Sequence, residues 1–131
     1  FFMALYCTKL RELRFVNAGH NPPYLCLENN QIHPLETGTT ILGTFDELPF
    51  LNVGSYTDLS SFCFFSYTDG LIETRNEDDE EFGVDRLIEC LNEFRGLPAT
   101  EIQKNIVERV REYAAKDHLF DDLTIIVIKK S

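Results

Sequence analysis

The sequence predicts an α+β domain with a mainly antiparallel sheet, because its apolar residues change period along the chain. Short apolar runs separated by Gly, Asn, Asp and Pro residues fill residues 1–67, as in successive strands and turns. Two segments with helical spacing follow, and the apolar run 125–128 returns to the strand pattern. Strands on both sides of a helical pair are typical of layered α+β folds.

The first half predicts a β-meander. Residues 1–8 and 13–16 are apolar runs joined by the polar turn 9–12, so they should pair as a hairpin. The remaining expected strands cover residues 24–27, 32–35, 50–53 and 62–67. The segments 36–40 and 43–49 are rich in Gly, Thr, Asp and Pro and should be loops.

The second half predicts two amphipathic helices. The first covers residues 84–94, with Leu87, Ile88 and Leu91 on one side, and ends at Arg95-Gly96. The second opens at residues 100–103, Thr-Glu-Ile-Gln, which have the pattern of a capping box. Its apolar face has helical spacing and consists of Ile102, Ile106, Val107, Val110 and Ala114.

Composition limits the function. A chain of 131 residues forms at most one domain, and 44% hydrophobic residues are enough for a real core. The net charge of −10 disfavours nucleic acid and anionic membrane surfaces as partners, since both attract Lys and Arg. Part of this charge lies in the acidic run 77–81, which should be a solvated loop.

The four cysteines are scattered along the chain and form no Cys-x-x-Cys pair. Cys7, Cys26 and Cys63 lie in strand-like runs and are interpreted as small buried hydrophobic residues, as expected in a reducing compartment. They predict neither a zinc site nor a disulfide framework.

Two acidic motifs point to chemistry. Residues 67–70, Tyr-Thr-Asp-Gly, end one strand, and residues 121–124, Asp-Asp-Leu-Thr, precede another, and both strands are expected to be fully buried. If these strands are neighbours, Asp69 and the pair Asp121/Asp122 meet at one edge of a sheet. Carboxylates placed there suit a hard divalent cation such as Mg²⁺ or Mn²⁺. The alternative is that all three are turn residues, because Asp-Gly is a common turn pair.

Four blocks in order resemble a known family. They are residues 15–23 (Phe-Val-Asn-Ala-Gly-His-Asn-Pro-Pro), 67–76 (Tyr-Thr-Asp-Gly-Leu-Ile-Glu-Thr-Arg-Asn), 81–83 (Glu-Phe-Gly, followed by Arg86-Leu87) and 121–124. Together they resemble the stage II sporulation protein E-type and RsbU-like phosphatases. These are bacterial members of the metal-dependent (phosphatase 2C type, PPM) serine/threonine phosphatase family.

The resemblance implies a β-sandwich with helices on both faces, of which residues 1–131 form the C-terminal part of a single domain. The family's first metal-binding block, an Asp followed by Gly-His-Gly, is not in this sequence and is expected upstream of Phe1. The segment alone is therefore expected to lack the first helical layer and to be incomplete as an enzyme.

The resemblance also implies the reaction, which is hydrolysis of phosphoserine or phosphothreonine by water activated by two Mg²⁺ or Mn²⁺ ions. Asp69 and Asp121 match the family's metal ligands. Asp122 matches a more variable position, as an acceptor for a metal-bound water or as a cap of the strand. Gly70 allows a tight turn beside the ions. No nucleophilic side chain is needed.

Three further residues match the family blocks around the site. His20 follows Asn17 and precedes a Pro-Pro turn, and two interpretations are open for this pair. They could contact water or phosphate near the ions, or the histidine ring could stabilise the turn by bonding backbone groups, which is the favoured interpretation. Gly43 matches a loop at the rim of the site, where it should set the backbone shape.

The expected partner is a phosphorylated regulatory protein, such as an anti-sigma-factor antagonist, and a sensor domain is expected upstream. A homodimer is also compatible with the resemblance. The expected location is the cytoplasm, with the full-length protein free or attached to a membrane sensor. The alternative function is a regulatory or interaction module that has kept the fold and lost catalysis. Retention of both Asp69 and Asp121 favours the enzyme.

Overall fold

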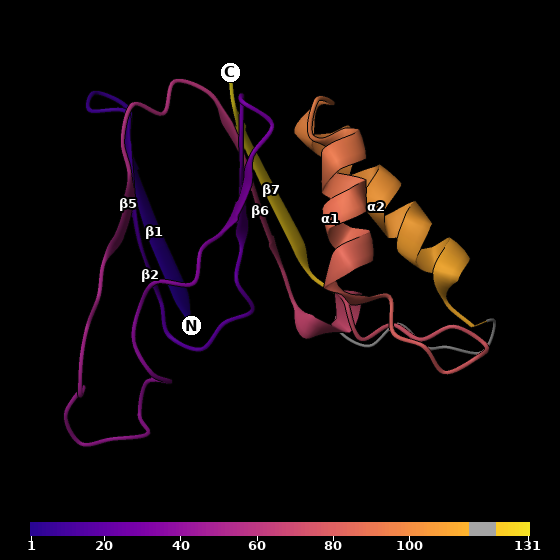
Figure 1. The fold of residues 1–131 in the computed structure, drawn as a ribbon, viewed down its shortest axis with the longest axis horizontal. Coiled ribbons are helices and arrows are strands. Elements are labelled where there is room, and N and C mark those ends of the chain that lie inside the picture. The colour runs from indigo at the N-terminus through magenta and orange to yellow at the C-terminus, as the bar shows by residue number, and fades with distance from the viewer. Residues whose placement is uncertain (116–122) are drawn as a thin grey trace.

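The computed structural model describes residues 1–115 and 123–131, which form three layers. One layer is a three-stranded sheet in the order β1-β2-β5, and the middle layer is a four-stranded sheet in the order β4-β3-β6-β7. Two helices cover the other face of the four-stranded sheet (Figure 1). All strand pairs within the two sheets are antiparallel, which confirms the predicted α+β class.

The elements follow the predicted order along most of the chain. The strands are β1 Phe2–Cys7, β2 Glu12–Asn17, β3 Tyr24–Leu27, β4 Ile32–Pro34, β5 Gly54–Tyr56, β6 Phe62–Tyr67 and β7 Ile125–Lys130. The helices are the 3-10 turn η1 Asp69–Leu71, α1 Gly83–Phe94 and α2 Ala99–Tyr113. Neither α-helix of the described residues is long and apolar enough to cross a membrane.

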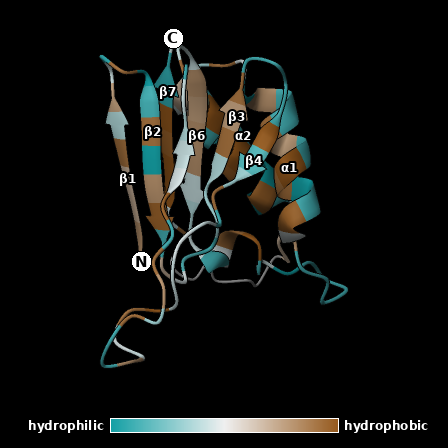
Figure 2. Cartoon of the chain, turned by 60° about the vertical axis from the view of Figure 1, so that its left-hand side comes forward, coloured by the Kyte–Doolittle hydropathy of each residue, from teal (hydrophilic) through white to brown (hydrophobic). Residues whose placement is uncertain are grey.

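Strand β6 lies at the centre of the core and is apolar on both faces. Cys63 and Phe65 face the helices, whereas Phe62 and Phe64 face the three-stranded sheet. In strand β2 buried residues instead alternate with half-buried or exposed ones, and bands of different hydropathy are visible along it (Figure 2). A strand between two packed layers needs hydrophobic residues at every position, whereas a strand with one solvated face needs them at every second position.

The expectation that the last strand is fully buried was wrong. Ile125 and Val127 pack toward the helices, but Ile126 and Ile128 are 51% and 53% exposed. Strand β7 is the edge of the four-stranded sheet, and no described strand of the other sheet covers its second face.

The predicted strand at residues 50–53 was also wrong, since the third strand of the first sheet is β5 at Gly54–Tyr56. Gly54 pairs with Phe15, and a Cβ atom at residue 54 would lie 2.2 Å from Cζ of the Phe15 ring. Only glycine lets the backbone pass this close to the ring. Leu51 and Val53 instead lie on an exposed loop.

The predicted capping box is absent, because α2 begins before it. Pro98 occupies the N-cap position, and its carbonyl accepts hydrogen bonds from the N–H groups of Glu101 and Ile102, both at 3.0 Å. Thr100 thus lies inside the first turn, and no side chain caps the helix. The predicted apolar faces are confirmed at Leu87 and Leu91 of α1 and at Ile102, Ile106 and Val110 of α2, which are all buried.

Strand β7 also holds the end of α1 in place. The Lys129 ammonium group donates to the carbonyl oxygens of Arg95, Gly96 and Leu97 at 2.9, 2.9 and 2.7 Å. These carbonyls follow the last turn of α1, where a helix leaves its C=O groups unpaired and favours a positive charge. Lys129 therefore links the helical layer to the sheet.

We predict that Gly54→Ala lowers the free energy of unfolding by about 1–3 kcal/mol, because the added methyl group overlaps the buried Phe15 ring. Urea denaturation of the full-length protein measures the loss. Gly96→Ala is the matched control, since a Cβ atom there meets nothing within 4 Å. Equal stability of the two variants would contradict the proposed contact.

Candidate functional site

The ends of several strands meet at one end of the molecule. Strand β6 is antiparallel to both neighbours, so its last residue, Tyr67, lies beside the start of β7 and close to the start of β3. Strand β2 ends at the same level, and η1 follows β6 directly (Figure 1). The family-like blocks at residues 15–23 and 67–76 are therefore brought together, although they are separated in sequence.

Asp69 is the first residue of η1, and its side chain is exposed at this end of the sheet. Its Oδ1 atom accepts a hydrogen bond from the N–H group of Gly70 at 3.1 Å. No ion pair among the described residues involves Asp69. The carboxylate is thus open to solvent at the tip of a buried strand, and its oxygens are hard donors that suit Mg²⁺ or Mn²⁺.

A buried threonine helps to close the turn that carries Asp69. The Thr74 hydroxyl is buried and donates to the carbonyl oxygen of Gly70 at 2.7 Å. Gly70 itself lies outside the left-handed region that Gly19, Gly43 and Gly83 occupy. The turn is therefore closed by the Thr74 hydroxyl and by the 3-10 hydrogen bonds of η1.

Thr68 and Thr124 join the end of β6 to the start of β7. The Thr68 N–H group donates to the Thr124 carbonyl at 3.1 Å, and the Thr68 hydroxyl accepts from the Thr124 N–H group at 2.9 Å. Continued by two positions past its last pair, Tyr67 and Ile125, the β6–β7 register would put Asp69 opposite Leu123. Asp121 and Asp122 lie outside the described residues, so their positions relative to Asp69 stay predictions.

Asn17 is buried, and its side chain holds the loop after β2 by hydrogen bonds. Its side-chain NH₂ group donates to the carbonyl oxygens of His20 and Leu35 at 2.9 and 3.1 Å, and its Oδ1 atom accepts from the His20 N–H group at 2.8 Å. Its backbone bonds to Thr37 and Thr39, both at 2.9 Å. With both ends of its amide occupied by backbone groups, Asn17 shapes the loop and has no amide group turned toward a ligand.

The His20 ring also contacts backbone. Its Nδ1 atom lies 2.6 Å from the carbonyl oxygen of Asn21, and the ring is 6.3 Å from the ring of Phe2. The Nδ1 contact corresponds to the turn-stabilising interpretation of this residue. Nε2 makes no hydrogen bond within the described residues.

Glycines allow close contacts between the end of β2 with its following turn and the loop segments around Gly38 and Ile41. Gly19 has a φ of 81°, and a Cβ atom there would lie 2.4 Å from Cγ1 of Ile41. Gly38 forms an isolated bridge with Asn17, whose carbonyl oxygen would lie 1.8 Å from an added Cβ atom. Gly43, at φ 85°, has open space around it, so its role is the left-handed turn itself.

Two tyrosines pack beneath the Asp69 turn. The rings of Tyr24 and Tyr67 are stacked with centroids 6.2 Å apart. Burial raises the pKa of Tyr67, and the neighbouring Tyr24 raises it further. Both phenols stay neutral at physiological pH, so they add no charge to this end of the sheet.

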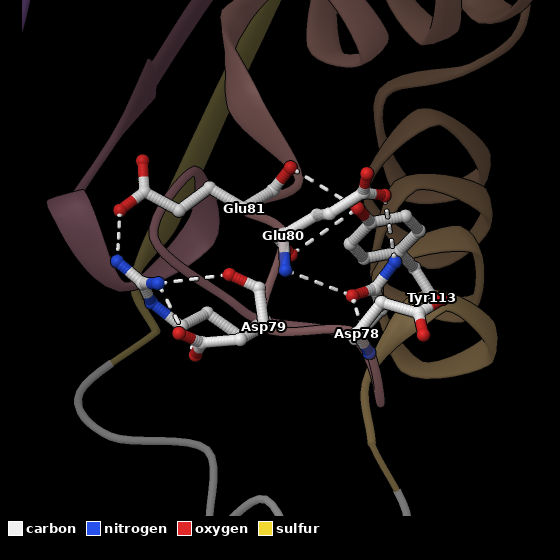
Figure 3. Close-up of polar contacts among 7 residues, drawn as sticks. Asp78, Asp79, Glu80, Glu81 and Tyr113 are labelled. Atoms are coloured by element: carbon white, nitrogen blue, oxygen red, sulfur yellow. Dashed lines mark hydrogen bonds and ion pairs between the residues drawn. The ribbon is translucent and has the colours of Figure 1, made fainter.

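The acidic run 77–81 is exposed, as predicted, but it is not a loose loop (Figure 3). The Arg75 guanidinium group pairs with Asp79 at 3.2 Å and with Glu81 at 2.6 Å. The Tyr113 hydroxyl of α2 donates to the carbonyl oxygens of Glu80 and Glu81 at 3.2 and 3.1 Å. The run is thereby held next to the segment that leaves η1.

Sequence reasoning missed the structural roles of Thr68, Thr74 and Asn17. The threonines occupy the predicted block 67–76, but their partners, Thr124 and the Gly70 carbonyl, appear only once the strands are paired. Among residues 1–115 and 123–131, no group of three His, Cys, Asp or Glu side chains could hold a metal ion. Within this part of the chain, Asp69 supplies a suitable donor but not a complete ligand set.

Comparison with known proteins gives a consistent result. A family model described as Stage II sporulation protein E (SpoIIE) matches residues 1–131. Protein IcfG of Synechocystis sp. is 27% identical over 120 residues, which make up 92% of this chain and 19% of that protein. The chain thus spans less than a fifth of this curated relative.

Solved structures share the fold. The SiaA-PP2C domain of Pseudomonas aeruginosa has a TM-score of 0.78 at 22% identity and covers 94% of this chain, which spans 48% of that one. For the SpoIIE phosphatase domain of Bacillus subtilis (Mn presoaked) the TM-score is 0.70 at 15% identity, with 99% and 56% covered. For the RsbU and RsbW domains of Rv1364c from Mycobacterium tuberculosis it is 0.74 at 20% identity, with 99% and 36% covered. The chain therefore has part of a PP2C-like fold.

We predict that Asn17→Asp destabilises the full-length protein by about 2 kcal/mol or more at pH 7, because a carboxylate oxygen would face two carbonyl oxygens that lose their donor. Burial and these acceptors raise the pKa of the introduced carboxyl group above its unfolded value of about 4. The folded state then binds the proton more tightly, so the penalty is small below that pH and grows as pH rises to the raised pKa.

Urea midpoints measured between pH 4 and pH 8 test this prediction. The matched control is Asn29→Asp, since exposed Asn29 also accepts a backbone N–H bond, from Gln31, but has no buried carbonyl to satisfy. A pH-independent loss in Asn17→Asp would show that the amide does not act as the donor described.

Proposed function

Because the chain belongs to the stage II sporulation protein E family, we propose that it forms part of a metal-dependent phosphatase domain that acts on phosphoserine or phosphothreonine in a partner protein. The observation that carries the proposal is Asp69, an exposed carboxylate at the tip of the buried strand β6. The chain spans about half or less of its relatives' lengths, so the activity is assigned to the complete domain.

We assign Asp69 and Asp121 as metal ligands, with Asp122 as an acceptor for a water molecule beside the ions or as a strand cap. The hydrogen bonds between Thr68 and Thr124 support this assignment, because they join the end of β6 to the segment that follows Asp121 and Asp122. Two Mg²⁺ or Mn²⁺ ions, when bound, neutralise phosphate oxygens and activate a water molecule for attack.

The chain's own residues position this chemistry. Thr74 and Thr68 restrain the backbone of the Asp69 turn, so that the main chain that carries the carboxylate loses little conformational freedom when a cation binds. Asn17 fixes the backbone around His20 at the same end of the sheets. Hydrolysis of this kind requires no nucleophilic thiol, and none of the cysteines is assigned a role in it.

The proposed substrate is a phosphorylated regulatory protein of a bacterial signalling pathway, such as an anti-sigma-factor antagonist. In one related structure RsbU and RsbW domains belong to one protein, which supports a role in regulation through protein partners. The relatives are longer than this chain, which leaves room for a sensor domain. The net charge of −10 makes nucleic acid an unsuitable substrate.

We predict that Asp69→Asn in the full-length protein lowers Mn²⁺-dependent release of phosphate from a phosphoprotein by about 100-fold or more, since the amide keeps the shape but removes a charge that stabilises the transition state. Asp121→Asn should have a similar effect. Asp78→Asn is the matched control, because Asp78 is an exposed carboxylate of the neighbouring acidic run. Cys63→Ser should keep its turnover per folded molecule.

The outcomes separate the two candidate functions. A folded wild-type protein that binds a phosphorylated partner but releases no phosphate with either cation would support the non-catalytic module. Full activity of the Asp69→Asn variant would contradict the assignment of Asp69 as a metal ligand. Loss of all activity in a folded Cys63→Ser protein would indicate a cysteine nucleophile and contradict the metal mechanism.

A further inference from the structure

Two cysteines face each other across the β3–β6 pair, toward the end of the sheet opposite to Asp69. Cys26 and Cys63 are direct partners in the antiparallel register. Both are 3% exposed and belong to the core cluster between the sheet and the helices, so their side chains share one face. Both are free thiols in the structure.

The register alone permits a covalent bond. Directly opposed residues of an antiparallel pair have Cα atoms about 5.5 Å apart when they are hydrogen-bonded and about 4.5 Å apart when they are not. Both distances lie inside the range of about 4.4–6.8 Å found for disulfides. Closure therefore requires side-chain rotation and no separation or sliding of the strands.

A cavity gives small molecules access to this pair. It has a volume of about 410 Å³, is lined by Cys26 and Cys63, and opens beside the end of α1 at Arg95 and Gly96. The remaining lining includes Lys129, the residue of β7 paired with Cys63. Neither of the other cysteines has a cysteine as cross-strand partner: Cys90 lies on α1, where it lines a separate cavity of about 350 Å³, and Cys7 of β1 pairs with Glu12.

The surroundings give the two thiols different roles. A hydrogen bond from Cys26 lowers the pKa of Cys63, and the Lys129 ammonium group lowers it further, against the effect of burial. The same hydrogen bond raises the pKa of Cys26, together with burial. Cys63 is therefore the thiol that ionises first, with a protonated thiol beside it, which is the usual arrangement of a reactive and a resolving cysteine.

We propose that Cys26 and Cys63 are a redox modification site, which forms a reversible intramolecular disulfide when a peroxide enters the cavity. The Cys63 thiol first loses its proton to water. Its sulfur attacks one peroxide oxygen, the O–O bond breaks, and a sulfenic acid and hydroxide form; the hydroxide takes up a proton. The Cys26 sulfur then attacks the Cys63 sulfur, the S–O bond breaks, and water leaves with the Cys26 proton.

In total, two thiols and one hydrogen peroxide give one disulfide and two water molecules. The peroxide is the oxidant and is reduced, and both sulfur atoms are oxidised. The new bond would join β3 to β6, the strand that leads to the Asp69 turn. This site does not depend on the proposed phosphatase activity, since no atom of the pair takes part in phosphate chemistry.

Peptide mapping of the full-length protein after treatment with hydrogen peroxide tests the proposal. We expect the wild-type protein to lose two of the four thiols of this chain and to yield a linked peptide that contains Cys26 and Cys63. A dithiol reductant should restore both. Cys90→Ser and Cys7→Ser should give the same link, because neither residue belongs to the pair.

Single variants test the order of reaction. Cys26→Ser should accumulate a sulfenic acid on Cys63 that a dimedone probe traps, whereas Cys63→Ser should react more slowly at Cys26. Retention of all four thiols in the wild-type protein would overturn the proposal, as would links only to Cys7, to Cys90 or between molecules. Equal trapping in the two variants would overturn the assignment of Cys63 as the reactive thiol.

Discussion

The burial of β6 between two apolar layers is the constraint on which the rest of this structure depends. Phe62 and Phe64 pack toward the three-stranded sheet, while Cys63 and Phe65 pack toward the helices. A strand in this position cannot shift its register by one residue without exchanging its two faces, and both neighbouring strands are paired to it. Its end therefore fixes where Asp69, the start of β7 and the loop before β3 meet.

The parts of the fold that depend on local periodicity could be predicted from the sequence. The helix faces repeat at intervals set by backbone geometry, and strand β6 is an almost unbroken apolar run, so these residues carry the signal themselves. The predictions that were wrong concern features that are set by tertiary contacts or by the position of an element in the fold. Strand β5 begins at Gly54, where the Phe15 ring leaves no space for a Cβ atom. The apolar segment before Gly54 is a loop. The start of α2 is set by Pro98, and the exposed face of β7 by its position at the sheet edge.

In the candidate site, too, some features could be predicted from the local sequence, and others depend on residues that are distant in the sequence. A strand followed by Asp-Gly suggested that Asp69 would lie at an exposed strand tip, and this position depends only on where β6 ends. The function of Asn17 could not be read from its block, because one of its carbonyl partners belongs to Leu35 and appears only in the folded loop. The Thr68–Thr124 pair likewise exists only because β6 and β7 are neighbours.

Strand β6 thus separates two kinds of chemistry along its length. At its C-terminal end, the turn to η1 exposes an oxygen donor to solvent, which suits hard cations and phosphate chemistry. Toward its N-terminal end, Cys63 faces Cys26 beside a lined cavity, which suits soft sulfur chemistry. Between the two ends, Phe65 and Tyr67 are buried in one core cluster and Phe64 in the other. Covalent linkage of β6 to β3 would therefore add a second restraint to the strand that positions Asp69, without any contact between the thiols and the carboxylate.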